Sequence, residues 1–422
     1  MTVDSDKINI FLHYGYFPNA QVPLPESLQC WLDSKNQPDL NVTNEADLII
    51  KGANALRRSF KLTIDNDQNK THVVPLSGGL DSRTILANLL EQIDPGRIIA
   101  VTFGMPGSPD YERARSIARK ADVKWEGMDL SPGTWKWSTG LLIKTSERSE
   151  LPTLLFDSCV NHAIQLRYGK DAVYWSGFMG DSLGCTEPIS NKVRTWEEAR
   201  GAFMKRNCIS NNAKITADNY IPERCLPSRP FIQPERLDYY SQLNHFVRQQ
   251  CLTRHIYSPL GYDIRYPFLN HEWVNFILNV PTQYSLRQVL YRKIQLSYWP
   301  HLFSTWNSPF RDSSLWESLK HKRRRSLVMR YIRKSFNALG IRMIADKSVK
   351  YIDWNHSLLH QDDFRDVVFS NLQDLKSRKI IDWLDLEELW HSNRNFNKRM
   401  AFELMILAAL ELHIKAKKLM IS

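Results

Sequence analysis

The sequence predicts an α/β fold built on a doubly wound parallel sheet, and two observations carry this prediction. Short apolar runs occur at 72–76, 98–103 and 172–176, and the first two are each followed by a polar loop and then by apolar residues at helical spacing. Strands that alternate with helices form parallel βαβ units. Because ligands bind outside the carboxyl ends of such strands, the loops that follow these runs are expected to line one crevice. The three loops are Ser77–Ser82, Phe103–Asp110 and Gly177–Asp181.

The remaining elements are expected in the following order. Residues 1–70 indicate a loop-rich lead-in, because four prolines fall within the first forty positions, with one helix near 45–62. Helices at 83–92 and 110–120 follow the first two strands, and the second is expected to be buried through Ala114, Ile117 and Ala118. From about residue 190 the chain is predicted to be mainly helical, with helices at 196–204, 237–252, 271–278 and 396–418. The predicted parts are an N-terminal segment 1–65, an α/β domain 66–310 and a helical C-terminal region 311–422.

Composition indicates a soluble globular protein. The chain has 422 residues, of which 43% are hydrophobic and 24% charged, so it can form two or three packed domains. Six scattered cysteines without a CxxC pair argue against a zinc site and against a secreted disulfide framework. The acidic start of the chain, Met1–Asp6, does not resemble a signal peptide, and no apolar run reaches membrane-spanning length. A cytoplasmic location is therefore expected.

The formal net charge of +11 favours anionic partners such as nucleotides, nucleic acid or acidic surfaces. Much of the excess lies in Lys320–Arg325 and continues through Arg330, Arg333 and Lys334, with apolar residues between the charges. This segment predicts a basic amphipathic helix. It is either a solvated helix face beside an anion-binding cleft or a docking surface for RNA or an acidic partner.

The glycine turn after the first strand has the features of a phosphate-binding loop. Gly78 and Gly79 lack a Cβ, so the backbone can approach a phosphate, and the following helix directs free N–H groups at it. Ser77 and Ser82 can add hydroxyl donors. Asp81 would repel a phosphate, so a magnesium ion between the two is the simplest explanation of a carboxylate here. The turn is not a Walker A loop, which requires GxxxxGK[ST].

Together, Leu76–Ser82, Val101–Asp110, Ser176–Asp181 and Arg265–Asn270 resemble the motifs of the ATP-pyrophosphatase (PP-loop) synthetase domain of the asparagine synthetase family. The resemblance covers about residues 10–310. It implies the adenine nucleotide alpha hydrolase-like PP-loop fold, with ATP and Mg²⁺ as cofactors. It also implies activation of a carboxylate as an acyl adenylate, release of pyrophosphate, and attack by an amine or ammonia.

The resemblance further implies roles for individual residues. Asp81 and Asp181 correspond to the family's paired magnesium ligands. The backbones of Leu76 and Phe103 correspond to positions that contact adenine, and Ser176 and Gly177 to positions beside the nucleotide. The pyrophosphate loop itself corresponds to Ser77, Gly78, Gly79, Asp81 and Ser82.

Three departures from the family bear on catalysis. Residue 2 is Thr, where glutamine-dependent members have a nucleophilic cysteine, and Gly15–Asn19 resembles the linker after their glutaminase domain, so glutamine hydrolysis is not expected. The position of a family glutamate is occupied by Phe178, which cannot accept a proton. The position of a family lysine falls near Asn307. Tyr291, Arg292 and Lys293 are possible substitutes, and Lys293 is taken as the catalytic candidate.

The expected function is that of a glutamine-independent, AMP-forming amide ligase or amidotransferase acting on a small-molecule or peptide carboxylate. An ammonia-supplying or peptide-binding partner would fit this reaction. Alternatives are a peptide macrolactam cyclase similar to lasso-peptide cyclases, a nucleotide-binding pseudoenzyme, and a tRNA-modifying PP-loop enzyme. Neither a membrane nor nucleic acid is the expected partner.

Overall fold

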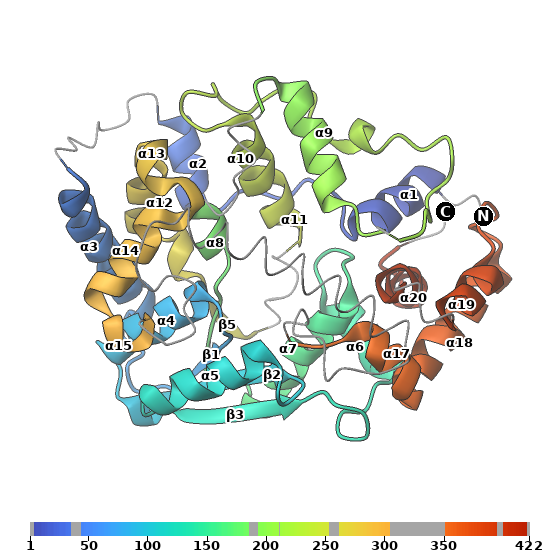
Figure 1. Cartoon of the computed structure of the whole chain (residues 1–422), viewed down its shortest axis with the longest axis horizontal. Coiled ribbons are helices and arrows are strands. Elements are labelled where there is room, and N and C mark those ends of the chain that lie inside the picture. The colour runs from blue at the N-terminus through green and yellow to red at the C-terminus, as the bar shows by residue number, and fades with distance from the viewer. Residues whose placement is uncertain are drawn as a thin grey trace, which may run out of the picture.

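A five-stranded, all-parallel sheet forms the centre of the α/β part of the molecule (Figure 1). The computed structural model describes residues 4–34, 44–184, 193–210, 212–252, 261–303, 351–394 and 400–419. The strand order is β3-β2-β1-β4-β5, so the chain leaves β1 in one direction and returns to its other side with β4. The strands are β1 (His72–Pro75), β2 (Ile98–Gly104), β3 (Lys124–Asp129), β4 (Val173–Trp175) and β5 (Asp263–Arg265).

Helices cover both faces of this sheet, which confirms the predicted doubly wound α/β architecture. Val74 and Trp175 point into a core that also holds side chains of α3, α4, α5, α12 and α14, whereas Val73 and Tyr174 pack with Ile164 of α7 on the opposite face. The helices that flank the sheet are α3 (Glu45–Ile64), α4 (Leu80–Leu90), α5 (Pro109–Lys120), α6 (Thr139–Arg148), α7 (Leu155–Tyr168), α8 (Gly180–Leu183), α12 (His271–Leu278), α13 (Thr282–Ser285), α14 (Val289–Tyr298) and α15 (Pro300–Phe303).

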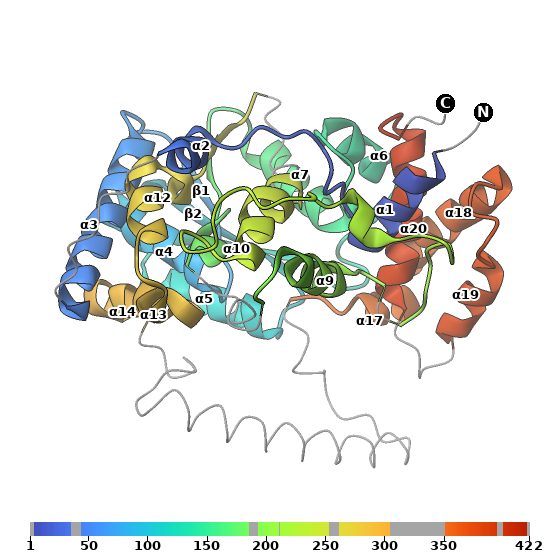
Figure 2. The ribbon, with the colours of Figure 1, turned by 90° about the horizontal axis from the view of Figure 1, so that it is seen from above.

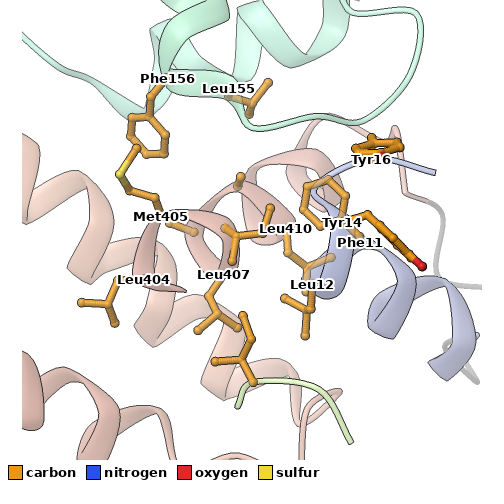
Figure 3. Packing of buried hydrophobic residues seen from close by; sticks show 14 of the residues in the cluster. Phe11, Leu12, Tyr14, Tyr16, Leu155, Phe156, Leu404, Met405, Leu407 and Leu410 are labelled. Atoms are coloured by element: carbon orange, nitrogen blue, oxygen red, sulfur yellow. The ribbon is translucent and has the colours of Figure 1, made fainter. Parts of the chain in front are cut away.

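A second core, which we call the helical core, joins the beginning of the chain to its C-terminal helices (Figure 2). Phe11 and Leu12 of α1 lie beside Leu407 and Leu410 of α20, and Phe156 of α7 lies beside Met405 of the same helix (Figure 3). Nearly every side chain from 401 to 412 is buried, as expected of a helix enclosed by other helices. The other helices are α1 (Ser5–Tyr14), α2 (Glu26–Asp33), α9 (Trp196–Asn207), α10 (Tyr239–Leu243), α11 (Gln249–Leu252), α17 (Trp354–His360), α18 (Asp362–Arg378), α19 (Leu386–Arg394) and α20 (Ala401–Lys415).

The expectation of a loop-rich N-terminal segment was wrong, because α1 and α2 both precede the helix predicted at 45–62. Asp4 caps α1 by accepting from the backbone N–H groups of Asp6 and Lys7, and Gly15 ends it in the left-handed region at φ 73°. These capping residues are a local signal for a short helix. Pro18, Pro23 and Pro25 lie between α1 and α2, so they delimit helices here, and Pro38 lies outside the described residues.

Three further elements differ from the expectation. Strand β3 at the sheet edge is rich in polar residues, and β5 has three residues, so neither produces an apolar run in the sequence. The helix predicted at 237–252 is α10 and α11 joined by one π-helical turn, Asn244–Arg248.

The closing helix begins at Ala401 within the described residues, and Asn307 and the basic segment Lys320–Lys334 lie outside them. Within the described ranges, no helix is both long and apolar enough to cross a membrane.

Candidate nucleotide-binding site

The glycine turn lies at the carboxyl end of β1 and is fixed to the neighbouring strand. The backbone N–H of Leu76 donates to the Val101 carbonyl at 2.8 Å, and the Thr102 hydroxyl donates to the Leu76 carbonyl at 2.9 Å. The Leu76 N–H is therefore occupied by its hydrogen bond to β2. The Leu76 carbonyl oxygen has one further lone pair that can accept from a ligand. A nucleotide base in contact with the Leu76 backbone would therefore donate a hydrogen bond to this carbonyl oxygen.

Two serine hydroxyls close the turn onto the first turn of α4. The Ser77 N–H donates to Ser82 Oγ at 3.1 Å, and the Gly79 N–H donates to Ser77 Oγ at 3.1 Å. Gly79 is the N-cap residue of α4, and no side chain caps the helix. The amides at the start of α4 are thus available to an anion, together with the positive end of the helix dipole.

Gly78 is required by the close approach of α5. A Cβ at Gly78 would lie 2.7 Å from Asp110 Oδ1 and 3.0 Å from the Cδ of Arg113. At Gly79 the nearest atom to an added Cβ is Ser77 Oγ at 3.0 Å. The absence of a Cβ at Gly78 therefore allows α5 to pack closely against the turn. At Gly79 it leaves the turn open to a ligand.

Arg83 fixes the turn from behind. Its Nε donates to the Gly79 carbonyl at 3.0 Å and Nη2 to the Gly78 carbonyl at 3.2 Å, while its guanidinium lies 5.0 Å over the ring of Phe303. Because the carbonyl and the following N–H of a trans peptide point in opposite directions, these bonds also orient the amides of Gly79 and Leu80. Burial, and then Arg113, lower the pKa of Arg83 to about 10, so it is charged at neutral pH.

The carboxylates of Asp81 and Asp181 are brought together from two different strand ends. The loop after β4 passes so close to α4 that a Cβ at Gly180 would lie 2.6 Å from Asp81 Cγ, and one at Gly177 would lie 3.4 Å from Asp81 Cβ. Burial, and then the negative charge of Asp181, raise the pKa of Asp81 above its usual range. The two carboxylates repel each other, and a cation between them would remove this repulsion.

This pair fits a magnesium ion. Mg²⁺ binds in nucleotide sites through one or two carboxylates together with substrate phosphates and water. In the described part of the chain, no group of three or more His, Cys, Asp or Glu side chains could hold a metal ion. Asp81 and Asp181 alone would therefore leave most of the six positions around a magnesium ion to water and substrate oxygens.

Tyr291, one of the possible substitutes for the family lysine, is hydrogen-bonded to Asp81. The Tyr291 hydroxyl of α14 lies 3.0 Å from Asp81 Oδ1 and 3.2 Å from Thr84 Oγ1, and Gln295 Nε2 donates to the same Thr84 oxygen at 2.8 Å. Burial, and then Asp81, raise the pKa of Tyr291 well above its ordinary value, so the hydroxyl keeps its proton. Tyr291 therefore acts as a neutral hydrogen-bond donor to the carboxylate.

Three non-glycine residues with positive φ lie in segments beside Asp81. Met179 precedes α8 with φ 68°, and Arg287 and Gln288 precede α14 with φ 58° and 60°. The αL region is costly for residues with a Cβ, and such residues cluster at functional sites. A Cβ at Gly184 would lie 3.1 Å from the ring of Tyr291 and 3.5 Å from Gln288 Nε2, so the two strained segments meet beside Asp81.

Two residues with expected roles in the second half reaction lie elsewhere. The Phe178 side chain is buried in the sheet core, 5.9 Å from the ring of Tyr266, and its N–H donates to Ser176 Oγ at 3.2 Å. The Lys293 ammonium forms an ion pair with Glu45 at the start of α3, at 2.5 Å. The structure thus brings Tyr291, and not Lys293, to the paired carboxylates.

A second tyrosine and carboxylate meet at the end of β2. Gly104 has φ 143°, and a Cβ there would lie 2.7 Å from the Tyr351 carbonyl, which accepts from the Met105 N–H at 2.8 Å. The Tyr351 ring packs edge-on against Phe103, with ring centroids 5.9 Å apart, and its hydroxyl donates to Asp157. The polypeptide just before α17 therefore covers the strand end at which Phe103 was expected to contact a base.

The site thus unites the predicted residues 76–82, 103, 176, 177 and 181 along one edge of the sheet. Arg83, Asp157, Tyr351 and the contact between Tyr291 and Asp81 were not predicted. Arg83 directly follows the glycine turn, and its position could have indicated a role. No family model matches this sequence, and no curated protein matches it either.

Proposed function

We propose that this chain binds Mg-ATP at the glycine turn and forms an amide bond through an acyl adenylate. The supporting observation is that Asp81, in the first turn of the uncapped helix α4, lies against the loop after β4 and feels the negative charge of Asp181. The backbone amides and the helix dipole attract phosphates, whereas the two carboxylates repel them. A cation bound between the carboxylates and the phosphates would remove this repulsion. The resemblance of four sequence segments to the asparagine synthetase family supports the same reaction.

In the proposed first step, a carboxylate oxygen of the substrate attacks the α-phosphorus of ATP. A P–O bond breaks, and pyrophosphate leaves with the electron pair of that bond. The amides of α4, oriented by Arg83, and the hydroxyls of Ser77 and Ser82 would hold the departing group. Magnesium, held by Asp81 and Asp181, would supply charge neutralisation for the phosphates.

In the second step, an amine or ammonia attacks the acyl carbon, AMP leaves, and the nitrogen loses a proton. Phe178 cannot take that proton, and its side chain is buried in the core. The amine must therefore lose it to another group, to the substrate or to water. General-base assistance contributes about 10² to 10⁴ in rate, so a slow second step is expected if no substitute is present.

Pyrophosphate release is the direct test of this function. Binding of Mg-ATP is measured first by calorimetry, and pyrophosphate formation is then assayed with a panel of carboxylic acids and with ammonia. Asp81→Asn and Asp181→Asn should each lower pyrophosphate formation by about 10²- to 10³-fold. Asp171→Asn is the matched control, because Asp171 is exposed and precedes β4 at the opposite end of that strand. Full activity in both site variants would contradict the proposal.

A nucleotide-binding protein without turnover is the second candidate, and the burial of Phe178 favours it. It predicts Mg-ATP binding that depends on Asp81 and Asp181, but no pyrophosphate with any acid. Failure of the wild-type chain to bind Mg-ATP would contradict both candidates.

A further inference from the structure

The hydroxyl of Tyr291 belongs to a buried hydrogen-bond chain that ends on Asp81. Thr84 Oγ1 donates to the Leu80 carbonyl at 3.0 Å and accepts from Gln295 Nε2 at 2.8 Å. A tyrosine has one hydroxyl proton, and a carboxylate is a stronger acceptor than another hydroxyl. The Tyr291 proton is therefore directed at Asp81 Oδ1, 3.0 Å away, while Thr84 Oγ1 packs against the tyrosine oxygen at 3.2 Å.

The tyrosine itself is rigidly held. Its side chain is completely buried, and its ring packs against Phe268 and Trp273 with centroids 6.3 and 5.7 Å away. The strained residues Arg287 and Gln288 set the start of α14, one helical turn before it. Packing on all sides leaves the hydroxyl one position, so the hydrogen bond to Asp81 is preorganised.

We propose that Tyr291, supported by Thr84 and Gln295, is a positioning residue that fixes one oxygen of Asp81 and leaves the other for a divalent cation. This inference rests on the proposed function, because it takes Asp81 as a metal ligand. Groups that orient a ligating side chain in this way contribute about 10- to 100-fold to metal affinity.

A neutral donor suits this role better than a cation would. A lysine or arginine at Tyr291 would form an ion pair with Asp81 and compete with the metal for its charge. The tyrosine hydroxyl orients the carboxylate and leaves its negative charge in place. Nearby, the cationic Arg83 makes its hydrogen bonds to the carbonyls of Gly78 and Gly79.

Direct metal titration tests this role without requiring the acyl substrate. Mn²⁺ is the probe, added to the full chain with a non-hydrolysable ATP analogue, and free Mn²⁺ is measured by electron paramagnetic resonance. Tyr291→Phe should weaken Mn²⁺ binding by about 10- to 100-fold, because the ring remains and the hydroxyl is lost. Asp81→Asn should weaken it at least as much.

Tyr174→Phe is the matched control. Tyr174 is also buried, and its hydroxyl donates to the Gly169 carbonyl at 2.7 Å, at the opposite end of β4 from Asp181. It should lose comparable stability and keep wild-type Mn²⁺ affinity. If Tyr291→Phe does not fold, Gln295→Leu removes the support from Thr84 and should lower Mn²⁺ affinity in the same direction.

The outcomes separate this inference from the proposed function. Equal Mn²⁺ affinity in wild type and Tyr291→Phe, with loss in Asp81→Asn, would overturn the positioning role and leave the metal assignment standing. No Mn²⁺ binding by the wild type in the presence of the analogue would overturn both. An equal loss in Tyr174→Phe and Tyr291→Phe would show a general effect of stability and would also overturn the inference.

Discussion

The hydroxyl of Tyr351 lies 3.1 Å from both carboxylate oxygens of Asp157. Burial raises the pKa of Asp157 to about 6, and the hydrogen bond from Tyr351 opposes that shift. Asp157 belongs to the first turn of α7, whereas Tyr351 immediately precedes the C-terminal helices. The pair therefore ties the helical core to the end of β2, where Tyr351 also covers Gly104.

Loss of this hydrogen bond should destabilise the fold. Tyr351→Phe should lower the free energy of unfolding by about 1 to 3 kcal/mol, because a partly buried carboxylate loses its donor. Urea denaturation at pH 7.5 measures the change. Asp157→Asn and the double variant complete a double-mutant cycle, and a coupling energy close to zero would show that the contact is not energetically significant.

Acid should destabilise the helical core through His413. Burial lowers the pKa of this imidazole to about 4, and its neutral ring bonds to the Ser146 hydroxyl and to the Thr153 backbone. A lowered pKa means that its contribution is present above about pH 6.5 and is lost as the pH falls towards 4. Between pH 7.5 and 5 the loss from this one group is about 2 kcal/mol.

The variant His413→Asn isolates that contribution. It should be less stable than wild type at pH 7.5, yet lose less stability on acidification when urea unfolding is compared at pH 7.5 and 5. His271→Asn is the control, because the His271 side chain is 60% exposed, and it should keep the wild-type pH dependence. An unchanged pH dependence in His413→Asn would exclude His413 as a source of acid sensitivity.

Arg83 should control phosphate binding through the shape of the glycine turn. Arg83→Met removes the donors to the Gly78 and Gly79 carbonyls and should weaken binding of magnesium pyrophosphate, measured by calorimetry, by about tenfold or more. Arg83→Lys keeps the charge without the fork of donors and should recover only part of the affinity. The exposed Arg119 of α5 provides the control Arg119→Met, and equal affinity in Arg83→Met and this control would contradict the role.

Gly78 and Gly140 should respond in opposite directions to a methyl group. Gly78→Ala places a Cβ 2.7 Å from Asp110 Oδ1 and should cost about 1 to 3 kcal/mol of stability through displacement of α5. Gly140→Ala meets no atom within 4 Å in helix α6 and should stabilise by up to about 1 kcal/mol. Thermal unfolding of both variants tests this, and a neutral Gly78→Ala would show that α5 accommodates the methyl group.

The sequence predicted those parts of the site that follow directly from strand ends. Asp81 and Asp181 could be placed together, because the carboxyl ends of parallel strands share one edge of a sheet. Tyr291 and Tyr351 could not be placed, because their contacts depend on how distant helices pack on that edge. Strand β3 escaped detection for a related reason: an edge strand with polar side chains shows no apolar run.

For Phe178 the sequence predicts the chemistry of the side chain but not where the side chain lies in the fold. The family resemblance predicts a proton-accepting side chain at this position, and phenylalanine has none. That the ring is buried against Tyr266 depends on the backbone between β4 and α8, including the left-handed Met179. A backbone conformation unusual for methionine has no signal in the sequence, since the same residue adopts ordinary φ values elsewhere.

The contact between α1 and α20 has a consequence for biosynthesis. Phe11 packs edge-on against His413, with ring centroids 5.4 Å apart, so α1 packs against a helix that is synthesised much later. At about 5 to 20 residues per second, the intervening chain takes about 20 to 80 s to synthesise. During that interval the apolar face of α1 lacks its native partner. A chaperone that holds this segment should therefore increase the yield of folded protein, and deletion of α20 should leave the nascent chain prone to aggregation.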